Sequence, residues 1–532
     1  MFRLIRSSAG LRRSCTALLA ALLAAGSNPV AFSQNVTGVS RSGSLPTLGD
    51  NLELTAGAER RIGERIAASI YRDRDYIDDP VLEEYVQTIW QPLLAAAKAR
   101  GELSIELDER FAWELFLLRD RTINAFALPG GYFGLHLGLI GAVTSRDELA
   151  AVMGHELSHV TQRHISRLMT QQSRQTPWMI AAMIIGALAA GKNAQAGEAA
   201  IVGGQALAAQ SQLNFSRDME READRVGFGV MTDAGFDSRG VSSMFEKLQQ
   251  ASRINDNGSF PYLRSHPLTT ERIAEAQARL QLASPAQDKA LGVAQDRFFH
   301  AMMAARARVL ADPGVDVLRT MVAEAQRQPQ PVQAAAQPSA ADIRAAGVFY
   351  AGSLAAARLR DFPLARNFAE RLRTLAANTP AAGKVGLLSL EVDQMAGVVS
   401  PSASGIDISR TASRADLLVQ SRSLLAAGRA KDVGDKLLTW VTAHPKDALA
   451  WQTLAIAYGN QGQNVRAIRA DAEARAAQLD YTAALDRFKA AQIMMRSNPG
   501  SADFVEGSII DARARQVESL VKEQALQDKL DR

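Results

Sequence analysis

Apolar residues recur at helical spacing along most of the chain. In residues 52–100, for example, Ile62, Ile66 and Ile70 are four positions apart, and a second series of this kind follows. Spacings of three and four residues predict amphipathic helices, so two helices are expected in this stretch. Similar patterns continue to about residue 312, and the first half of the chain is therefore predicted to be mostly α-helical.

Three strand-like segments interrupt the helical pattern of the first half. Residues 111–118 and 122–128 are short, apolar and rich in aromatic and β-branched side chains. A Pro-Gly-Gly turn at 129–131 then precedes the apolar residues 132–135. Such short runs bounded by turn residues predict a small antiparallel sheet. The fold class predicted for the first half is α+β, mostly α.

A stretch of linker composition separates the two halves of the chain. Residues 323–342 contain Pro329, Pro331 and Pro338 among Gln and Ala residues. This composition is typical of a linker between domains. We therefore expect a domain boundary here, with connecting helices over residues 286–322 before it.

Beyond the boundary, the chain is rich in Ala and Leu and has a weak period of 34 residues. Residues 346–379, 414–447 and 448–481 fall in one phase, whereas residues 380–413 match it weakly. The frame 448–481 agrees with the tetratricopeptide pattern at Trp451, Leu454, Ala455, Tyr458, Gly462, Ala467 and Ala474. Because a helix pair cannot bury its apolar face alone, we expect an α-helical tetratricopeptide-like solenoid over residues 343–520. An undefined α-helical domain is the alternative.

The first 33 residues have the layout of a cleaved secretory signal. An arginine-bearing start is followed by an apolar run from Thr16 to Ala25 and by the segment Ala-Phe-Ser at 31–33. The run is about half of the ~20 residues that a membrane-spanning helix needs, so a membrane anchor is the weaker interpretation. The single cysteine, Cys15, lies in this segment, and the mature chain would therefore have no disulfide and no thiolate ligand.

The charge balance argues against nucleic acid as a partner. The signal-like segment holds four arginines and no acid, and the rest of the chain has 56 basic and 56 acidic residues. Only 6% of the residues are aromatic. A neutral chain with few aromatic side chains lacks both the basic field and the stacking surfaces that nucleic-acid binding usually requires. Its 47% of hydrophobic residues is enough to form buried cores.

An H-E-L-S-H motif, with His155, Glu156 and His159, carries the strongest chemical signal in the chain. Ser145 and Glu148 form a capping-box pair that predicts the start of a helix through the motif. Residues four apart share one helix face, so both histidines can bind one metal ion while Glu156 lies beside them. A metal held in this way polarises a water, from which Glu156 can take a proton. Two satisfied core histidines are the alternative.

A second helix offers a third metal ligand about 60 residues later. Ser216 can cap a helix that contains Glu220 and Asp224, which lie one turn apart on a common face. One of these carboxylates can bind the metal while the other orients a ligating histidine. Glu222, between them, is expected to point elsewhere. Taken alone, such a pair is usually a solvated face, and its position after the H-E-x-x-H motif makes it a ligand candidate.

These motifs resemble those of the zinc peptidase family that includes the CAAX prenyl endopeptidases. The resemblance rests on H-E-x-x-H, on the E-x-x-A-D segment at 220–224 and on the segment N-A-F-A-L-P-G-G at 124–131, and it covers about residues 45–285. The signal-like start, the lack of long apolar spans and the repeat-like tail resemble the periplasmic branch of that family, the β-barrel assembly-enhancing proteases.

The resemblance implies a zincin-like metallopeptidase domain with one Zn²⁺ per subunit. It implies that His155, His159 and Glu220 bind zinc, that Glu156 is the general base, and that Asp224 supports the ligands. It further implies a periplasmic location and clients among outer-membrane β-barrel proteins stalled during assembly. Contact with the β-barrel assembly machinery would run through the repeat domain.

A second signature of the family includes His266, in the segment S-H-P-L, and Arg272 six residues later. His266 can donate to the oxyanion of the tetrahedral intermediate, with Arg272 adding charge. Alternatively, His266 can occupy the fourth metal position as a ligand at rest, which would silence the enzyme. A loop histidine without a role is the third interpretation. Residues 255–267 are rich in Gly, Asn, Ser and Pro, and a mobile loop is expected there.

The other histidines of the chain are expected to be structural: His136, His164, His300 and His444. Asn124, Ala125 and Phe126 lie in a strand candidate next to the active helix. Peptidases of this kind pair an exposed strand edge with the substrate backbone, so these residues are a candidate substrate-binding strand. A core strand is the alternative.

Residues 178–190 are almost wholly apolar. Thirteen residues in a helix reach about 20 Å, which is short of the ~30 Å hydrocarbon core of a bilayer. We expect a helical hairpin between the two metal-binding helices, with at most peripheral membrane contact.

The sequence as a whole predicts a secreted zinc endopeptidase that attacks extended or unfolded polypeptide and docks through a C-terminal repeat domain. The competing hypothesis is a non-catalytic chaperone or assembly scaffold with a latent zinc site. Both hypotheses give a role to the C-terminal repeat domain, but only the enzyme needs Glu156.

Overall fold

The computed structural model describes residues 54–171, 216–254, 262–282, 290–331, 337–497 and 504–530. The predicted signal segment with Cys15 and the apolar segment 178–190 lie outside these ranges. No helix within the described ranges is both long and apolar enough to cross a bilayer.

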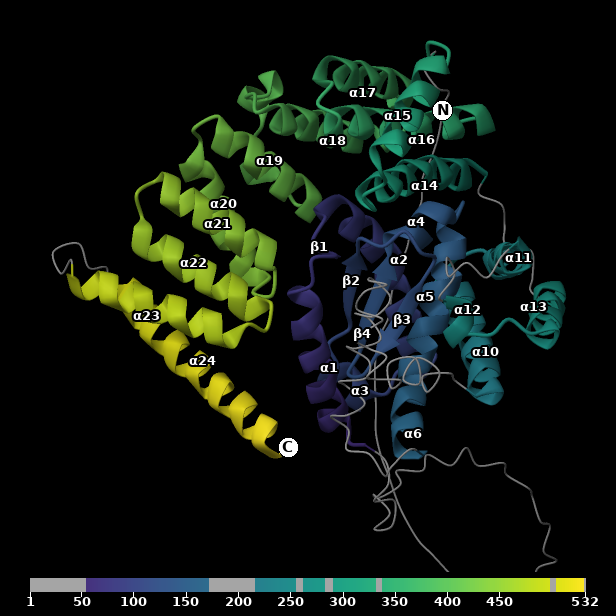
Figure 1. The fold of residues 1–532 in the computed structure, drawn as a ribbon, viewed down its shortest axis with the longest axis horizontal. Helices are drawn as coiled ribbons and strands as arrows, with labels where there is room; N and C mark the ends of the chain where they lie inside the picture. Colours follow the sequence, from purple (N-terminus) through teal and green to yellow (C-terminus); the bar gives the residue numbers. More distant parts are fainter. Residues whose placement is uncertain are drawn as a thin grey trace, which may run out of the picture. The chain divides into compact units, whose positions relative to one another are not determined.

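The first half of the chain combines helices with one small sheet, in agreement with the predicted α+β class (Figure 1). Its elements are, in chain order, α1 (Ala56–Tyr71), β1 (Tyr76–Ile77), α2 (Pro80–Ala99), α3 (Ile105–Arg110), β2 (Glu114–Leu118), β3 (Ala125–Leu128), β4 (Tyr132–His136), α4 (Leu137–Ala142), α5 (Arg146–Thr161), α6 (His164–Gln171), α10 (Arg217–Asp233), α11 (Arg239–Ile254), α12 (Tyr262–Ser265), α13 (Thr270–Leu282), α14 (Ala290–Leu310) and α15 (Val315–Arg327).

The sheet is mixed, and the predicted antiparallel sheet is wrong in one pairing. Its strand order is β1-β2-β4-β3, with antiparallel pairs β1–β2 and β3–β4 and a parallel pair β2–β4. After β2, the chain forms β3 at the edge of the sheet. The following hairpin leads into β4, which lies between β2 and β3 and runs parallel to β2. The turn residues predict only the hairpin, because apolar runs do not say which strand a returning strand pairs with.

Two glycines with positive φ allow this hairpin to turn beside α1. Gly130 has φ 74° and Gly131 has φ 78°, a region that side-chain-bearing residues rarely adopt. A Cβ atom at Gly130 would also lie 2.7 Å from the Arg60 Cα atom. The close approach therefore requires glycine, and it fixes α1 against the end of the sheet.

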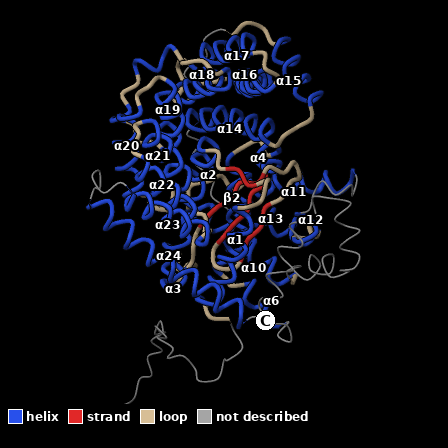
Figure 2. The backbone as a smooth tube through the Cα atoms, turned by 60° about the vertical axis from the view of Figure 1, so that its left-hand side comes forward, coloured by secondary structure: helices blue, strands red, loops and turns tan. Residues whose placement is uncertain are grey.

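The second half of the chain is entirely helical in its described residues (Figure 2). Its elements are α16 (Ala340–Arg358), α17 (Phe362–Ala376), α18 (Ala382–Ala396), the 3₁₀ turns η1 (Pro401–Gly405) and η2 (Ile408–Arg410), α19 (Arg414–Ala426), α20 (Ala430–Ala443), α21 (Ala448–Asn460), α22 (Asn464–Ala477), α23 (Tyr481–Ser497) and α24 (Phe504–Leu530).

The helix boundaries follow the 34-residue phase of the sequence. The frames 414–447 and 448–481 each hold one helix pair, α19–α20 and α21–α22, and α17 ends within the frame 346–379. The weak frame 380–413 holds α18 and two 3₁₀ turns instead of a second helix. A helical C-terminal region consistent with repeats is thus present, and its assignment to the tetratricopeptide type stays a prediction.

The two halves share one hydrophobic core. A single cluster of buried side chains extends from Ala56 to Val419, with α16 packed on α14 and α19 packed on α2. The arc of helices then returns to α1 (Figure 1), where Leu479 packs against the same hydrophobic cluster as Tyr71 and Arg72 Nη2 lies 3.8 Å from Asp480 Oδ1. The tail is therefore part of the same packed unit as the sheet.

The predicted linker contains regular structure at both ends. Helix α15 runs to Arg327, inside residues 323–342, and α16 begins at Ala340. The predicted domain ranges therefore remain predictions, because packing is continuous on both sides of the linker.

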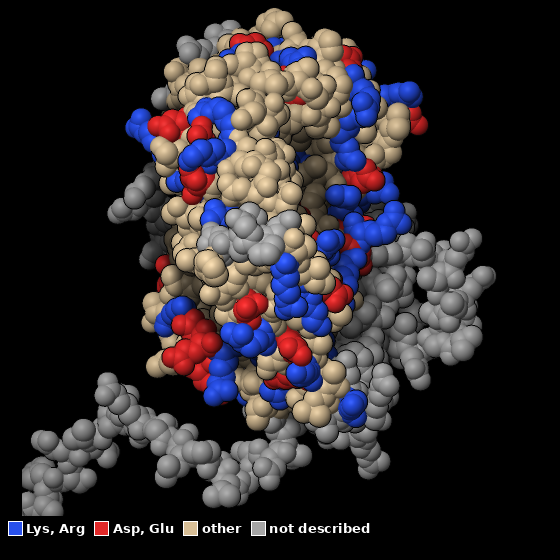
Figure 3. Space-filling model, turned by 90° about the vertical axis from the view of Figure 1, so that its left-hand side faces the viewer, with Lys and Arg blue, Asp and Glu red and all other residues tan. Residues whose placement is uncertain are grey.

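On the face of the molecule in Figure 3, basic and acidic side chains are intermixed around an uncharged area, without a large basic patch.

Candidate metal centre and active site

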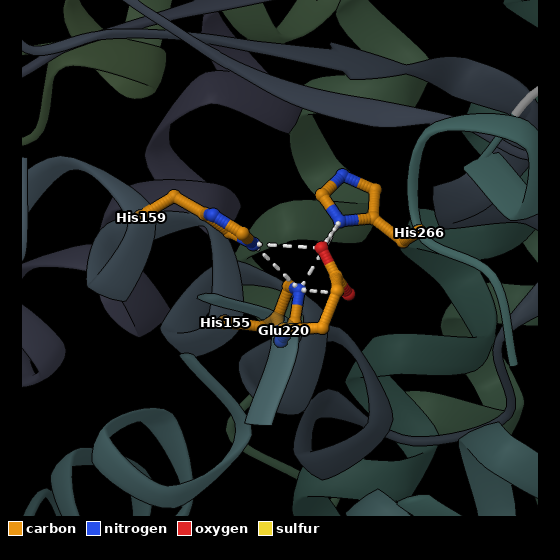
Figure 4. A group of neighbouring side chains, drawn as sticks. All are labelled: His155, His159, Glu220 and His266. Atoms are coloured by element: carbon orange, nitrogen blue, oxygen red, sulfur yellow. Dashed lines mark hydrogen bonds and ion pairs between the residues drawn. The ribbon is translucent and has the colours of Figure 1, made fainter. Parts of the chain in front are cut away.

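Four side chains from three segments converge on one buried point. His155 and His159 come from α5, Glu220 from α10, and His266 from the residue after α12. One potential ligand atom from each lies within 4.8 Å of all the others. Figure 4 shows the imidazoles turned toward the Glu220 carboxylate, with its Oε1 atom 2.9 Å from His266 Nδ1 and 3.4 Å from His159 Nε2. The structure thus groups the predicted ligands.

Local helix geometry brings the two motif helices into this position. The Ser145 and Ser216 hydroxyls cap α5 and α10 by accepting hydrogen bonds from the backbone of Glu148 and Met219, as the sequence predicted. The two helices then pack through small residues. A Cβ atom at Gly227 of α10 would lie 3.0 Å from the Gly154 backbone of α5, so glycine permits the close approach that places Glu220 beside His155.

The donor set fits a zinc ion. Three imidazole nitrogens and one carboxylate oxygen are ligands that zinc prefers. All four residues are buried, and His155 Nε2 lies 3.0 Å from His159 Nε2 and 3.3 Å from His266 Nδ1. Nitrogens this close share too few protons to satisfy every pair, whereas a cation accepts all their lone pairs at once. Both carboxylate oxygens of Glu156 are also buried without a hydrogen bond of good geometry from the described residues.

Two members of the cluster, Glu220 and His159, have pKa values that favour the deprotonated form, which is the form that binds a metal. Although burial opposes ionisation, the charges and hydrogen bonds of His266 and His155 hold the pKa of Glu220 far below its usual range. Burial and the neighbouring His155 and His266 hold the pKa of His159 well below its usual value. Metal ligands must be deprotonated, so Glu220 and His159 are already in the ligand form.

His155 is the exception in this cluster. Burial alone would lower the pKa of His155, but hydrogen bonds to Asp224 and Glu220 outweigh it and raise that pKa to about 10. Asp224 Oδ1 lies 3.0 Å from His155 Nδ1, which leaves Nε2 facing the cluster. Asp224 thus lies where it can orient a histidine, and Glu220 lies in the ligand group, which agrees with the roles that the family resemblance implies for this pair.

Glu156 lies at the edge of the cluster. The Glu156 Oε1 atom is 3.4 Å from His266 Nε2. Among the contacts of the described residues, none pairs Glu156 with Arg272. Burial, which is the main influence, raises its pKa, against the opposing charges of His266 and His155. A buried carboxylate with a raised pKa is a stronger base than an exposed one.

Arg272 lies behind the ligands and not beside Glu156. Its guanidinium donates two hydrogen bonds to Asp224, at 2.7 and 2.8 Å, and one to the Pro267 carbonyl at 2.9 Å. Its Nη1 atom is also 2.8 Å from Glu220 Oε2. In this structure Arg272 thus holds Asp224, Glu220 and the segment of His266 together, which is a positioning arrangement; its contribution to the oxyanion stays a prediction.

The segment of His266 is helical where it is described. Residues 255–261 lie outside the described ranges, but Tyr262–Ser265 form α12, so the predicted loop does not extend through these residues. The Tyr262 ring stacks on His266, with centroids 4.7 Å apart. The motif search missed Tyr262, because an aromatic residue four positions before a histidine carries no specific signal in the sequence.

His164 and Glu222 were also missed. The His164 ring lies against His159, with 2.9 Å between their Nδ1 atoms, and its Nε2 atom is 3.0 Å from Glu222 Oε2. Glu222 stays outside the group of candidate ligands, as the sequence suggested, but it contacts His164. The structural interpretation of His164 assumed one continuous helix, whereas the chain breaks between α5 and α6 at Arg163, which has φ 54° and brings His164 against His159.

The candidate substrate strand lies next to the site. Helix α5 contacts β3, which is the last strand in the order of the described sheet. Ala125 and Phe126 belong to β3, whereas Asn124 precedes it and its carbonyl accepts a hydrogen bond from the His136 amide. One edge of β3 thus pairs with β4, and substrate pairing along the other edge stays a prediction.

The remaining histidines stay outside the cluster. His136 interacts with Thr122, and His300 interacts with Tyr85 and the Val143 carbonyl. His444 stacks on Trp440 in the second half of the chain. These contacts are the structural ones that the sequence predicted for them.

Comparisons with known proteins agree with the motifs. Residues 80–280 match peptidase family M48. The beta-barrel assembly-enhancing protease of Escherichia coli K12 is 31% identical over 277 residues, which are 52% of this chain and 54% of that protein. The protein of the same name from Yersinia pestis is 28% identical over 81% of this chain and 84% of its own length. The mitochondrial metalloendopeptidase OMA1 of Schizosaccharomyces pombe is 31% identical over 31% of this chain and 46% of its own length. The chain thus spans about half the length of the Escherichia coli relative that it matches.

Proposed function

We propose that this chain, which carries a peptidase family M48 domain over residues 80–280, is a zinc-dependent endopeptidase that cleaves unfolded or misassembled proteins. The observation that carries the proposal is the buried group of His155, His159, Glu220 and His266 with Glu156 beside it. The ligand group explains a metal, and hydrolysis gives a role to an additional buried carboxylate that has no hydrogen bond of good geometry from the described residues.

His155, His159 and Glu220 would hold the zinc, with Asp224 fixing the ring of His155. When bound, the ion supplies Lewis-acid chemistry for the peptide carbonyl and for water. Glu156 takes a proton from the attacking water on a carboxylate oxygen and delivers it to the leaving amine. Its burial favours the first step, because a carboxylate with a raised pKa accepts a proton more readily.

The structure represents a closed state in this proposal. His266 is 2% exposed and Glu156 is 2% exposed, so no peptide reaches the cluster while α12 stays in place. As the fourth donor, His266 would fill the position that a catalytic zinc keeps for water. A movement of His266 and Tyr262 away from the cluster would open that position and admit a substrate along β3.

The cellular role proposed here is quality control and assembly of outer-membrane β-barrel proteins in the periplasm. It rests on the names of the relatives from Escherichia coli and Yersinia pestis and on the signal-like first 33 residues. The helical second half would serve for docking to the β-barrel assembly machinery or to its clients. One hydrophobic cluster contains residues of both halves, which would connect a docking surface on the second half to the peptidase half.

A chaperone or scaffold with a latent zinc site is the second candidate. One observation favours it: four protein donors in a buried cluster are the pattern of a structural zinc site, which lacks an open position. The two candidates differ in what they require of Glu156, because a structural site needs no base.

The test compares the mature parent chain with Glu156→Gln on an unstructured peptide. We expect the variant to retain zinc and to lose about 10²- to 10⁴-fold in rate, which is the usual contribution of a general base. Glu64→Gln, at a partly exposed position on α1, is the matched control and should cleave at the parent rate. Hydrolysis by zinc-loaded Glu156→Gln near the parent rate would reject the enzyme proposal.

A further inference from the structure

A second line of hydrogen-bonding side chains reaches the metal cluster from the far side of His159. His159 Nδ1 lies 2.9 Å from His164 Nδ1, and His164 Nε2 lies 3.0 Å from Glu222 Oε2. Arg167 donates to the same Glu222 oxygen at 2.7 Å. Both histidines are fully buried, whereas the Glu222 side chain is 30% exposed. The line thus runs from the candidate ligand to the protein surface.

The order of donors and acceptors along this line is set by its two ends. Glu222 pairs with the Arg167 guanidinium at 2.7 Å and offers only acceptor oxygens as a carboxylate. It therefore accepts, and His164 Nε2 must carry the hydrogen. With its hydrogen on Nε2, the His164 ring presents a lone pair on Nδ1, which can accept from the N–H at His159 Nδ1. This leaves a lone pair on His159 Nε2, the atom that faces the cluster.

The backbone is shaped to make this contact. In one continuous helix, residues five apart point about 140° from each other, so His164 would face away from His159. The chain instead breaks at Arg163, a non-glycine residue with φ 54°, which is an unfavourable conformation. The Arg163 guanidinium holds the break by donating to the Leu54 carbonyl and to Glu59.

We propose that His164 is a positioning residue for the metal site, and that Glu222 and Arg167 fix it so that His159 presents a lone pair on Nε2 to zinc. The inference rests on the proposed function, because it assigns these residues a role in holding the metal of that site. Asp224 has the equivalent relation to His155, so each motif histidine would be oriented by its own carboxylate, one directly and one through a second imidazole. Hydrogen bonds of this kind orient ligands and raise their affinity for metal.

The competing explanation is that His164 merely fills the core between α5, α6 and α10. Packing alone predicts that changes to His164 alter the stability of the metal-free protein. A positioning role predicts a change in zinc affinity that does not follow from stability. The two effects can be measured separately on the full mature chain.

Glu222→Ala is the principal variant, because its partly exposed side chain can be removed without a buried void. We expect its zinc dissociation constant, measured by competition with a chromophoric chelator, to rise by about 10- to 100-fold. The melting temperature of the metal-free chain should stay at the parent value. Glu271→Ala is the matched control. Glu271 lies on α13 and pairs with Arg221, which is on the same helix α10 as Glu222, but it is outside the line of hydrogen bonds. The zinc affinity of this variant should change less than about twofold.

His164→Phe tests the middle of the line, since it preserves much of the ring volume and removes both hydrogen bonds. Its zinc affinity should fall at least as far as that of Glu222→Ala, and the double variant should be no weaker than the weaker single variant. Glu222→Asp, which keeps a carboxylate, should recover part of the loss. Parent-like zinc affinity in Glu222→Ala overturns the inference, whether or not His164→Phe folds. A parent chain that binds no zinc would instead overturn the proposed function, and this inference with it.

Discussion

Two buried clusters of charged side chains in this protein differ in how their hydrogen bonds are satisfied. At the first cluster, Arg306 of α14 donates to Asp79, Glu391 and the Tyr350 hydroxyl over 2.6 to 3.0 Å, which uses all five guanidinium hydrogens. At the second, the metal cluster, imidazole nitrogens face one another at 3.0 to 3.3 Å, and the oxygens of Glu156 have no hydrogen bond of good geometry from the described residues.

The difference separates a structural cluster from a chemical one. Charges that are fully paired inside a protein need nothing further, and the Arg306 cluster links α2, α14, α16 and α18. Buried polar groups without partners cost free energy, and they persist where a ligand or a reaction supplies the missing partner. Among the described residues, Glu156 at the edge of the metal cluster has this property, and the Arg306 guanidinium does not.

Removing the cation from the paired cluster should have the largest effect on stability. Arg306→Met would leave Asp79 and Glu391 buried without compensation, and we expect the free energy of unfolding to fall by about 3–5 kcal/mol. Denaturant titration of the parent and the variant measures this. Zinc stoichiometry of the fraction that folds should stay at the parent value. A fall of less than about 1 kcal/mol in the free energy of unfolding would contradict the structural role that we assign to the Arg306 cluster.

Opening the metal cluster should change activity and leave the Arg306 cluster untouched. If His266 is a ligand at rest, His266→Ala opens the position for water, and the variant should degrade an unstructured substrate faster than the parent. The structure supports this sign, because His266 Nδ1 lies in the ligand group. Initial rates at matched zinc occupancy decide the question. A fall of about 10²- to 10³-fold would instead identify His266 as an oxyanion donor.

A third, partly buried group consists of Arg414 with Asp78, Glu83 and Asp447. It should have a smaller effect on the free energy of unfolding, and this effect should depend on pH. Burial, together with the charges of Asp78 and Asp447 and against that of Arg414, raises the pKa of Glu83 to about 7. A carboxyl whose pKa is raised on folding contributes stability below its unfolded pKa of about 4.5, and this contribution is lost as pH rises through 7.

The corresponding test is Glu83→Gln between pH 5 and pH 8. We expect the parent to lose about 1 kcal/mol relative to the variant over this range, a small value because the Glu83 side chain is 32% exposed and screened by solvent. Denaturant titrations at the two pH values measure the difference. A gap between parent and variant that is the same at both pH values contradicts the assignment.

Short-range geometry made much of the metal cluster predictable from the sequence. The positions of His155 and His159 follow from helix periodicity, and the caps at Ser145 and Ser216 mark where both helices begin. Glu220 and His266 needed the family resemblance, because no local rule joins residues 60 to 110 positions apart.

Long-range features escaped sequence analysis for physical reasons. The parallel pairing of β2 with β4 depends on which side of the sheet the β3–β4 hairpin folds to. The contact of His164 with His159 depends on a left-handed residue at Arg163, whose side chain gives no sign of that conformation. The proline-rich stretch predicts a domain boundary, which stays a prediction; its composition gives no sign of the packing of α14 on α16 across it.

Removal and return of zinc tests the central claim most directly. The purified mature chain should contain one zinc per molecule and cleave an unstructured peptide. Chelation should abolish cleavage without unfolding the protein, because the Arg306 cluster and the shared core do not depend on the metal, and one equivalent of zinc should restore cleavage. A parent chain without zinc, or cleavage that continues unchanged after the metal is removed, would contradict the account.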